Sequence, residues 1–309
     1  MLTGRPRRRG NSRRSDGVLA RLSAMLLVVA LAFAAVPEEL SIRAMDDYGG
    51  SSTEVGASGS DWVTAGYKEM AKELGAAIAN KPMVPGETLG VYGFHVGIAT
   101  TVGFIKTGKQ DGTNPSGWDL ADPQEDPVPV IFIPQVQIRK GLPASLELGA
   151  NFGWIGMSQT GVVGVFGRWG ILEGYKPLPD VSLQLGYAGY VGNDELEVGV
   201  VDLSATVGYT LPFGSTPGIH SASFSPFVGI GLNEIHAAPR GDLSRTGLSG
   251  RIPEVNGIDA KDPNFDASFA PIVVDGGFRI LNGAFSATVS GTYAPSILPT
   301  VNVGFGFTY

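Results

Sequence analysis

The sequence predicts an all-β fold, an antiparallel transmembrane β-barrel of about ten strands, with a short N-terminal amphipathic helix before it. Segments of about ten residues alternate between large apolar and small polar side chains from Leu89 to the last residue. The two longest connections between these segments fall on the same side of the barrel, as the long external loops do in outer-membrane barrels, although two connections on the other side are longer than typical. No stretch beyond Val36 approaches the roughly twenty apolar residues of a transmembrane helix, so a membrane location would have to come from strands.

Residues 1–35 predict a cleaved secretory signal peptide. They hold seven arginines and one aspartate, followed by an apolar run from Ala24 to Val36 that contains the small-x-small site Ala32-Phe33-Ala34. A basic leader can also be a nucleic-acid-binding arm, but the apolar run directly after it favours export. Cleavage would leave 15 basic and 28 acidic residues, a net charge of -13 that argues against a nucleic-acid partner. The chain has no cysteine, which excludes a lipid anchor on cysteine and disulfide bonds.

Two different pieces precede the barrel. Residues 36–60 predict a flexible linker, because Asp46 to Ser60 is rich in glycine, serine and acidic residues. Residues 61–82 predict an amphipathic helix that ends at Asn80-Lys81-Pro82 and lies on the periplasmic membrane surface, plugs the barrel or caps its periplasmic mouth, the cap being favoured. The apolar face of this helix comprises Val63, Tyr67, Met70, Leu74, Ala77 and Ile78.

Residues 88–309 predict the barrel itself. One face of each strand is apolar, and the other is mostly Gly, Ser, Thr, Asn and Gln, whereas the solvent face of a soluble β-sandwich usually carries Lys and Glu. A small polar face suits the inside of a membrane barrel. The fourth segment is ambiguous in register. The ten segments are 92–104, 130–139, 145–154, 162–172, 181–188, 201–211, 224–233, 270–280, 285–293 and 300–309.

The connections predict which end of the barrel faces outward. If the first strand runs outward, the two longest connections, Thr107 to Pro127 and Ala238 to Asp266, are external loops. The tight Asn282-Gly283 hairpin signal then falls on the periplasmic side, together with both ends of the barrel.

Few charged side chains point inward in this pattern. Because unpaired charges in a narrow lumen are costly, we expect arginines to pair with carboxylates across the lumen, and this structural role is favoured over ion selectivity. The inward-facing candidates are His95, Arg139, Glu147, Arg168, Asp202, Asp275 and Arg279.

The sequence favours neither a catalytic nor a metal site. His95, Asp202 and Asp275 could form a hydrolytic site only in combination, and no protease motif accompanies them. His220-Ser221 falls in a predicted periplasmic turn. Asp259, Asp262 and Asp266 lack the glycine and terminal glutamate of an EF-hand. We therefore expect no enzyme activity, no cofactor and no metal.

The last strand carries the most specific motif. Asn302, Gly304, Phe307 and Tyr309 follow the order polar, x, Gly, x, x, aromatic, x, aromatic. This stretch resembles the C-terminal assembly signal of bacterial outer-membrane β-barrels, although it ends on tyrosine where phenylalanine is more usual. The resemblance implies location in the outer membrane, with the barrel-assembly machinery and outer-membrane lipid as partners.

Over residues 88–309 the chain resembles uncharacterised bacterial outer-membrane barrels that are loosely similar to hydrophobic-compound transporters of the outer membrane. Those transporters are longer and have more strands, and a ten-stranded wall encloses little space. The expected function is a narrow pore or a binder for a small, apolar ligand. The alternatives are a structural or surface-interaction barrel that acts through its long external loops, and a soluble exported β-sandwich that needs no detergent.

Overall fold

The computed structural model describes residues 40, 59–110, 114–121, 128–155, 160–174, 178–193, 195–213, 222–239, 267–295 and 297–309. The predicted signal peptide lies outside the described residues, as do the predicted linker apart from residues 40, 59 and 60, the His220-Ser221 pair and the three aspartates at 259, 262 and 266. Everything described below belongs to one compact unit, Pro37–Tyr309.

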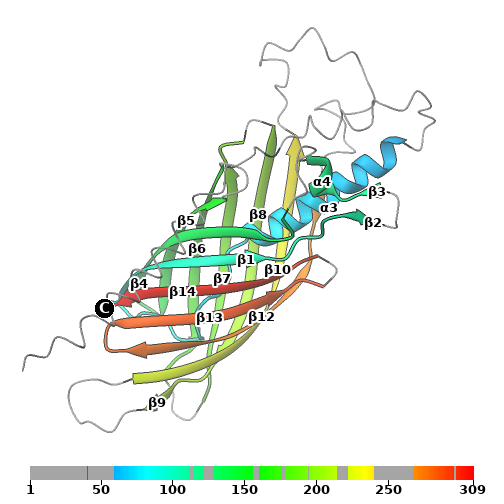
Figure 1. The fold of residues 1–309 in the computed structure, drawn as a ribbon. Helices are drawn as coiled ribbons and strands as arrows, with labels where there is room; N and C mark the ends of the chain where they lie inside the picture. The colour runs from blue at the N-terminus through cyan, green and yellow to red at the C-terminus, as the bar shows by residue number, and fades with distance from the viewer. Residues whose placement is uncertain are drawn as a thin grey trace, which may run out of the picture. The chain divides into compact units, whose positions relative to one another are not determined.

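Ten long antiparallel strands form a closed barrel, which confirms the predicted fold class (Figure 1). Each strand pairs with the next long strand along the chain, and the last pairs with the first from His95↔Thr308 to Gly103↔Thr300, so the wall has no free edge. The strands are β1 (Phe94–Gly103), β4 (Ile131–Leu142), β5 (Leu146–Ile155), β6 (Thr160–Leu172), β7 (Asp180–Val191), β8 (Leu196–Gly208), β10 (Ala222–Pro239), β12 (Ile272–Asn282), β13 (Phe285–Tyr293) and β14 (Pro299–Thr308).

Four short strands complete the description. β9 (Leu211–Phe213) and β11 (Ala267–Phe269) each add to β10, and β2 (Lys109–Gln110) pairs with β3 (Asn114–Pro115). The register of β6, which is ambiguous in the sequence, is resolved by burial, since Val163 and Val165 face outward and Arg168 faces inward.

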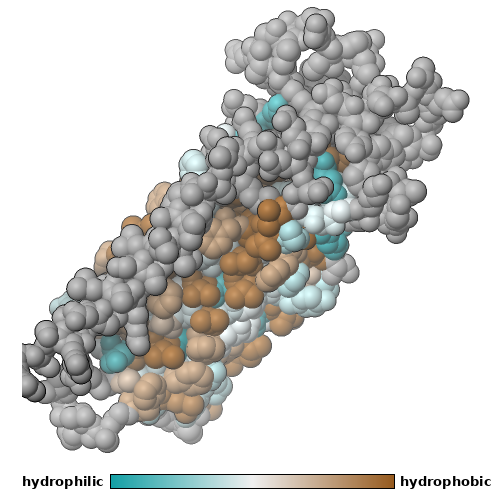
Figure 2. Space-filling model, viewed as in Figure 1, coloured by the Kyte–Doolittle hydropathy of each residue, from teal (hydrophilic) through white to brown (hydrophobic). Residues whose placement is uncertain are grey.

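The outer wall is an apolar belt between two groups of aromatic side chains. Exposed Val, Ile and Leu side chains alternate with buried small polar ones along the strands, and Figure 2 shows hydrophobic residues over the visible side of the wall. Phe94 and Phe104 flank β1, and ten residues at ~3.3 Å each, tilted by ~40°, rise roughly 25 Å, the height of the apolar band in such barrels. Outward-facing aromatic side chains near the end that carries the chain terminus are Tyr92, Phe94, Trp169, Tyr209, Phe285, Phe307 and Tyr309, and those near the other end are Phe104, Trp154 and Tyr293.

The two ends of the barrel differ. At the end we call the short-turn end, β1 begins, β14 ends, and tight turns such as Asn282-Gly283 join the strands, with Gly283 in the left-handed conformation at φ 61°. The opposite end, which we call the long-loop end, carries the connections from β1 to β4 and from β10 to β12.

Helix α3 (Gly59–Ile78) confirms the predicted amphipathic helix, but it lies at the long-loop end, where it packs against the short helix α4 (Gly117–Ala121), β8 and β10 (Figure 1). The helix therefore lies at the long-loop end rather than the short-turn end, and its position relative to the periplasm stays a prediction. Within the described part of the chain, neither helix is long and apolar enough to cross a bilayer.

An apolar core beneath α3 explains this position. Tyr67, Met70 and Leu74 of α3 are at most 1 % exposed, and Gly75 allows the helix to approach Ile235 closely. At the long-loop end the inward-facing side chains of the wall are apolar rather than polar, so they would contact water if α3 did not cover them. They include Ile131, Ile133, Ile155, Val162, Leu196, Val198, Val200, Ile235 and Leu298.

Candidate functional site

Residues 79–93, which we call the lumen segment, run through the barrel from the end of α3 to the start of β1. Their contacts progress along the wall from mid-strand positions to the short-turn end. The interior of the barrel is therefore occupied by the protein's own chain, and this filled lumen is the candidate functional site.

The upper part of the lumen segment is held by Asn80. Its Oδ1 accepts a hydrogen bond from Asn151 Nδ2 of β5 at 2.9 Å, and its Nδ2 donates to Asp202 Oδ2 of β8 at 2.8 Å. Both wall residues are buried near the middle of their strands. Lys81 caps the helix, because its Nζ donates to the carbonyl oxygens of Ala76 and Ala77 at 2.8 and 2.7 Å. The change from helix to extended chain is thus fixed inside the lumen.

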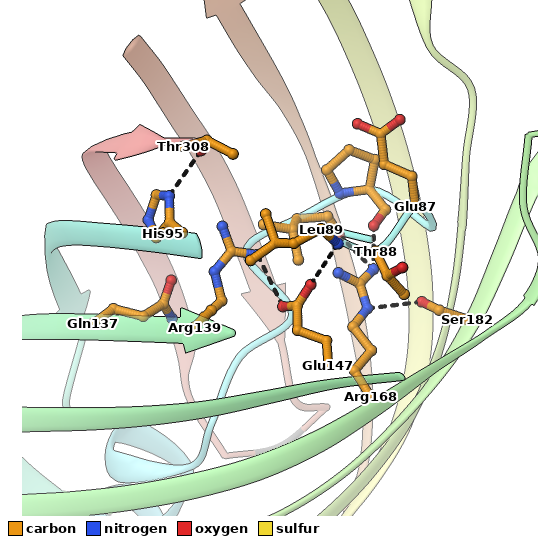
Figure 3. A network of polar contacts seen from close by, with 12 residues as sticks. Glu87, Thr88, Leu89, His95, Gln137, Arg139, Glu147, Arg168, Ser182 and Thr308 are labelled. Atoms are coloured by element: carbon orange, nitrogen blue, oxygen red, sulfur yellow. Dashed lines mark hydrogen bonds and ion pairs between the residues drawn. The ribbon is translucent and has the colours of Figure 1, made fainter. Parts of the chain in front are cut away.

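The middle part is held by Arg168 of β6 (Figure 3). Its Nη2 donates to the carbonyl oxygens of Val84, at 3.2 Å, and Pro85. Its Nε donates to Ser182 Oγ of β7 at 3.0 Å. A buried guanidinium that donates to backbone carbonyl oxygens fixes the position of the backbone. This contact does not depend on the side chains of the lumen segment.

The lower part is held by acidic groups. Glu87 forms an ion pair with Arg279 of β12 and accepts a hydrogen bond from Thr210 Oγ1 at 3.2 Å. The backbone N–H of Thr88 donates to Glu173 Oε1 at 3.0 Å. The segment then turns at Gly90, at φ 70°, and joins β1.

Glu147 of β5 joins the wall to this lower part. Its Oε1 accepts from Arg139 Nη1 of β4 at 3.1 Å and its Oε2 accepts from the backbone N–H of Leu89 at 3.1 Å. Figure 3 shows Glu147 between Arg139 and Arg168, with its carboxylate directed at Leu89. One buried carboxylate therefore links two strands and the lumen segment.

Glycines on the inner wall make room for the lumen segment. A Cβ added to Gly208 would stand 2.8 Å from Pro85 Cβ and 2.9 Å from the backbone nitrogen of Gly86. Gly164 and Gly186 lie in the same way against Asn80. The small inner face that the sequence shows is thus complementary to a polypeptide.

We expect Gly208→Ala to destabilise the barrel or displace the lumen segment, because Pro85 and the Gly86 backbone cannot move aside freely; the expected cost is about 1–3 kcal/mol. Gly167→Ala is the matched control, since the nearest atom to its added Cβ is Leu148 Cδ2 at 3.6 Å. Urea unfolding in detergent measures both. Equal midpoints for the two variants would contradict the close fit.

A small cavity lies beside the lumen segment among the described residues. A cavity of about 20 Å³ lies next to Met83, His95 and Arg139. A water molecule needs roughly 10–15 Å³ of such volume, so this cavity holds about one water.

All seven predicted inward charges are buried in the barrel, at most 6 % exposed. The pairs differ from the expected cross-lumen pairs, because Arg139 pairs with Glu147 on the adjacent strand and Arg279 pairs with Glu87 of the lumen segment. His95, Asp202 and Asp275 do not meet as a catalytic group. Their hydrogen-bond partners are respectively Thr308, Asn80 with Gln184, and Thr292. Among the described residues, no group of three or more His, Asp or Glu is placed to hold a metal ion.

The sequence reasoning missed the lumen segment itself and the apolar ring around α3. A signal for the ring is present, because Ile131 and Ile133 of β4 and Val198 and Val200 of β8 break the polar inner pattern at one end of the barrel only. An apolar inner ring predicts an apolar cover. The lumen segment carries no periodicity that would have revealed it.

A second polar group lies above the apolar core, where Glu73 of α3 meets the β1–β4 connection. Its Oε2 accepts from Trp118 Nε1 at 2.7 Å and from the backbone N–H of Lys106 at 3.2 Å. Lys106 Nζ stands 3.9 Å from Glu73 Oε1 and 3.0 Å from Glu69 Oε1. Burial raises the pKa of Glu73 to about 7, against the lowering effect of the Trp118 hydrogen bond.

We expect the docking of α3 on α4 to weaken as the pH rises through about 7, because a carboxyl with a raised pKa stabilises the folded state in its protonated form and is penalised when it ionises. The stabilisation is fully present below about pH 4.5, and the difference amounts to a few kcal/mol, from ~1.4 kcal/mol per pKa unit. The urea midpoint, measured from pH 4 to pH 8.5, should fall in the wild type and stay flat in Glu73→Gln. A Glu197→Gln control, at an outward-facing position of β8, should keep the wild-type slope. A flat wild-type profile would contradict the prediction.

Comparisons with known proteins give no function for this chain. No family model and no curated protein matches the chain. Among solved structures, the KdgM porin has 7 % identity and a TM-score of 0.30, covering 70 % of this chain and 99 % of its own. The outer membrane protein Omp33 of Acinetobacter baumannii has 13 % identity and a TM-score of 0.26, covering 71 % and 98 %. The N-terminal β-barrel domain of Pseudomonas aeruginosa OprF has 12 % identity and a TM-score of 0.27, covering 71 % and 99 %.

These TM-scores are all below 0.5, and it is the chain's own strands that define its class. A closed antiparallel wall, an apolar outer belt with aromatic girdles and a polar interior define a transmembrane β-barrel of the outer-membrane class. What distinguishes this barrel is the polypeptide segment held in its lumen.

Proposed function

We propose that this chain is an outer-membrane β-barrel that is closed to diffusion and acts through the surface at its long-loop end. This is the structural or surface-interaction function that the sequence leaves as the alternative to a pore. The observation that supports it is the lumen segment, which crosses the interior and binds the wall from Asn80 to Leu89. The cavity of about 20 Å³ beside this segment is far smaller than the ~300–1,000 Å³ of small-molecule sites.

The surface at the long-loop end has the features of a contact surface. It comprises α3, α4 and the chain around Lys106, and it contains a groove of about 360 Å³ lined in part by Lys68 and Lys72. The groove carries both signs of charge, since Glu69 and Lys106 also line it. The long-loop end points away from the periplasm if the short turns face it, as they do in outer-membrane barrels.

The experiment that tests this function is conductance of the mature protein in planar lipid bilayers. Folding is checked first by the difference in gel migration between boiled and unboiled protein from the outer-membrane fraction. We expect a heat-modifiable barrel that produces no steady single-channel current and no uptake of small sugars into liposomes. A stable ohmic conductance would show that the pore function is correct and the closed barrel is not.

A further inference from the structure

We infer that this barrel carries the N-terminal part of its own chain across the membrane, so that α3 stands on the outer face and β1 begins in the periplasm. The crossing itself follows from contacts within the barrel. The assignment of the outer face to the long-loop end rests on the proposed function.

The chain is already at the long-loop end well before α3. The carbonyl oxygen of Leu40 accepts a hydrogen bond from Asn193 Nδ2 at 2.9 Å, in the connection between β7 and β8. Asn193 is 1 % exposed, and its Oδ1 accepts from the backbone N–H of Leu196 at 2.7 Å, so this side chain is fixed by its own turn. Leu40 itself is buried in the apolar core with α3.

The chain then reaches the opposite end of the barrel before β1 begins. The backbone groups of Phe94 exchange two hydrogen bonds with Tyr309, at 2.7 and 2.8 Å, at the short-turn end. Between α3 and this point lie the fifteen residues of the lumen segment. Extended at ~3.3 Å per residue they reach about 50 Å, twice the ~25 Å height of the apolar band.

The wall leaves no lateral way for this segment to enter. Every long strand pairs with two neighbours, and β1 and β14 pair over nine residues at the seam. The lumen segment must therefore lie inside before the seam closes, because α3 is too wide, at ~10–12 Å with its side chains, to be drawn through a filled lumen afterwards.

The structure also explains why the lumen segment is held against movement in both directions. α3 is seated on the inner apolar ring at the long-loop mouth, with Gly75 against Ile235, so the helix resists being pulled inward. Arg168 and Arg279 hold the middle and lower parts of the segment, so it resists being pulled outward. The lumen is thus crossed by this one segment of the chain, which then remains inside it.

Single cysteines test which side each part occupies, since the chain contains none of its own. Ala65→Cys lies in an exposed part of α3, Val128→Cys marks the long-loop end just before β4, and Tyr92→Cys marks the short-turn end. Intact cells are treated with a membrane-impermeant maleimide, and the reaction is repeated after permeabilisation. We expect Ala65→Cys and Val128→Cys to react in intact cells and Tyr92→Cys to react only after permeabilisation.

The same labelling experiment tests separately whether the chain crosses the membrane and whether the long-loop end faces outward. Reaction of Val128→Cys without Ala65→Cys in intact cells would overturn the crossing and leave the outward-facing loops in place. Reaction of Tyr92→Cys without Val128→Cys would show the reverse orientation and overturn the proposed function.

A disulfide tests the seat of α3 independently of cells. A Cβ built on Gly103 lies 3.8 Å from Ala77 Cβ, the mean separation in disulfides. The control pair is Ala99 with Gly304 across the β1–β14 seam, at 3.6 Å. We expect Ala77→Cys/Gly103→Cys and Ala99→Cys/Gly304→Cys both to form an intramolecular bond under mild oxidation of heat-modifiable protein. Formation of the seam bond alone would overturn the inference.

Discussion

Removing residues 37–89 should convert the closed barrel into an open channel. The deletion takes away α3 and most of the lumen segment but keeps the turn at Gly90 and all ten long strands. The charges that held the segment, such as Arg168 and Arg279, then face water in place of the lumen segment, which removes the cost of leaving them buried and unpaired. In planar bilayers we expect discrete single-channel steps where the full mature chain shows none.

The matched control is a deletion of residues 37–78, which removes α3 but keeps the lumen segment. Because Arg168 binds backbone carbonyls of Val84 and Pro85, and Glu87 pairs with Arg279, the remaining segment should stay in place and the barrel should stay closed. Channels of equal size in both variants would show that the helix is the plug. Heat-modifiability of both variants must be retained for the comparison to count.

Most of the wall could be predicted from the sequence because the alternation of strand residues depends on local chemistry. Outward residues such as Val136 and Leu185 are exposed on the outer wall wherever their strand lies in it. Inward residues such as Gln137 and Asn302 form hydrogen bonds with residues of adjacent strands. The alternation within each strand is therefore enough to predict which of its faces points outward and which points inward. The terminal stretch from Asn302 to Tyr309 forms the closing strand for the same reason.

The site could be predicted only in part. The seven inward charges follow from the alternation, but their partners do not, since Glu87 and the carbonyl oxygens of Val84 and Pro85 come from a segment without any repeat. The end of the barrel at which α3 lies could not be predicted for a related reason. An amphipathic helix fits any apolar surface, and only the inner ring of Ile131, Val198 and Ile235 selects the long-loop mouth over the short-turn one.

Glu147→Gln should be the most destabilising single substitution of the inner wall, at about 3–5 kcal/mol, because it leaves a buried arginine without its carboxylate. Glu147 is 1 % exposed and accepts from both Arg139 and the backbone of Leu89. Its pairing partner in the β5–β6 register is Arg168, so the substitution leaves two guanidinium groups facing each other with no negative charge between them. Urea unfolding in detergent, followed by the loss of heat-modifiable migration, measures the change.

Two comparisons separate the ion pair from general damage to the wall. Glu197→Gln makes the same chemical change at an outward-facing position of β8. It should change the free energy of unfolding by less than about 1 kcal/mol. The double variant Glu147→Leu/Arg139→Met should recover much of the loss, since a buried pair replaced by apolar groups of similar size is often neutral. If Glu147→Gln matches Glu197→Gln, the carboxylate does not anchor the lumen segment, and the remaining contacts, such as those of Asn80, Arg168 and Arg279, must hold it.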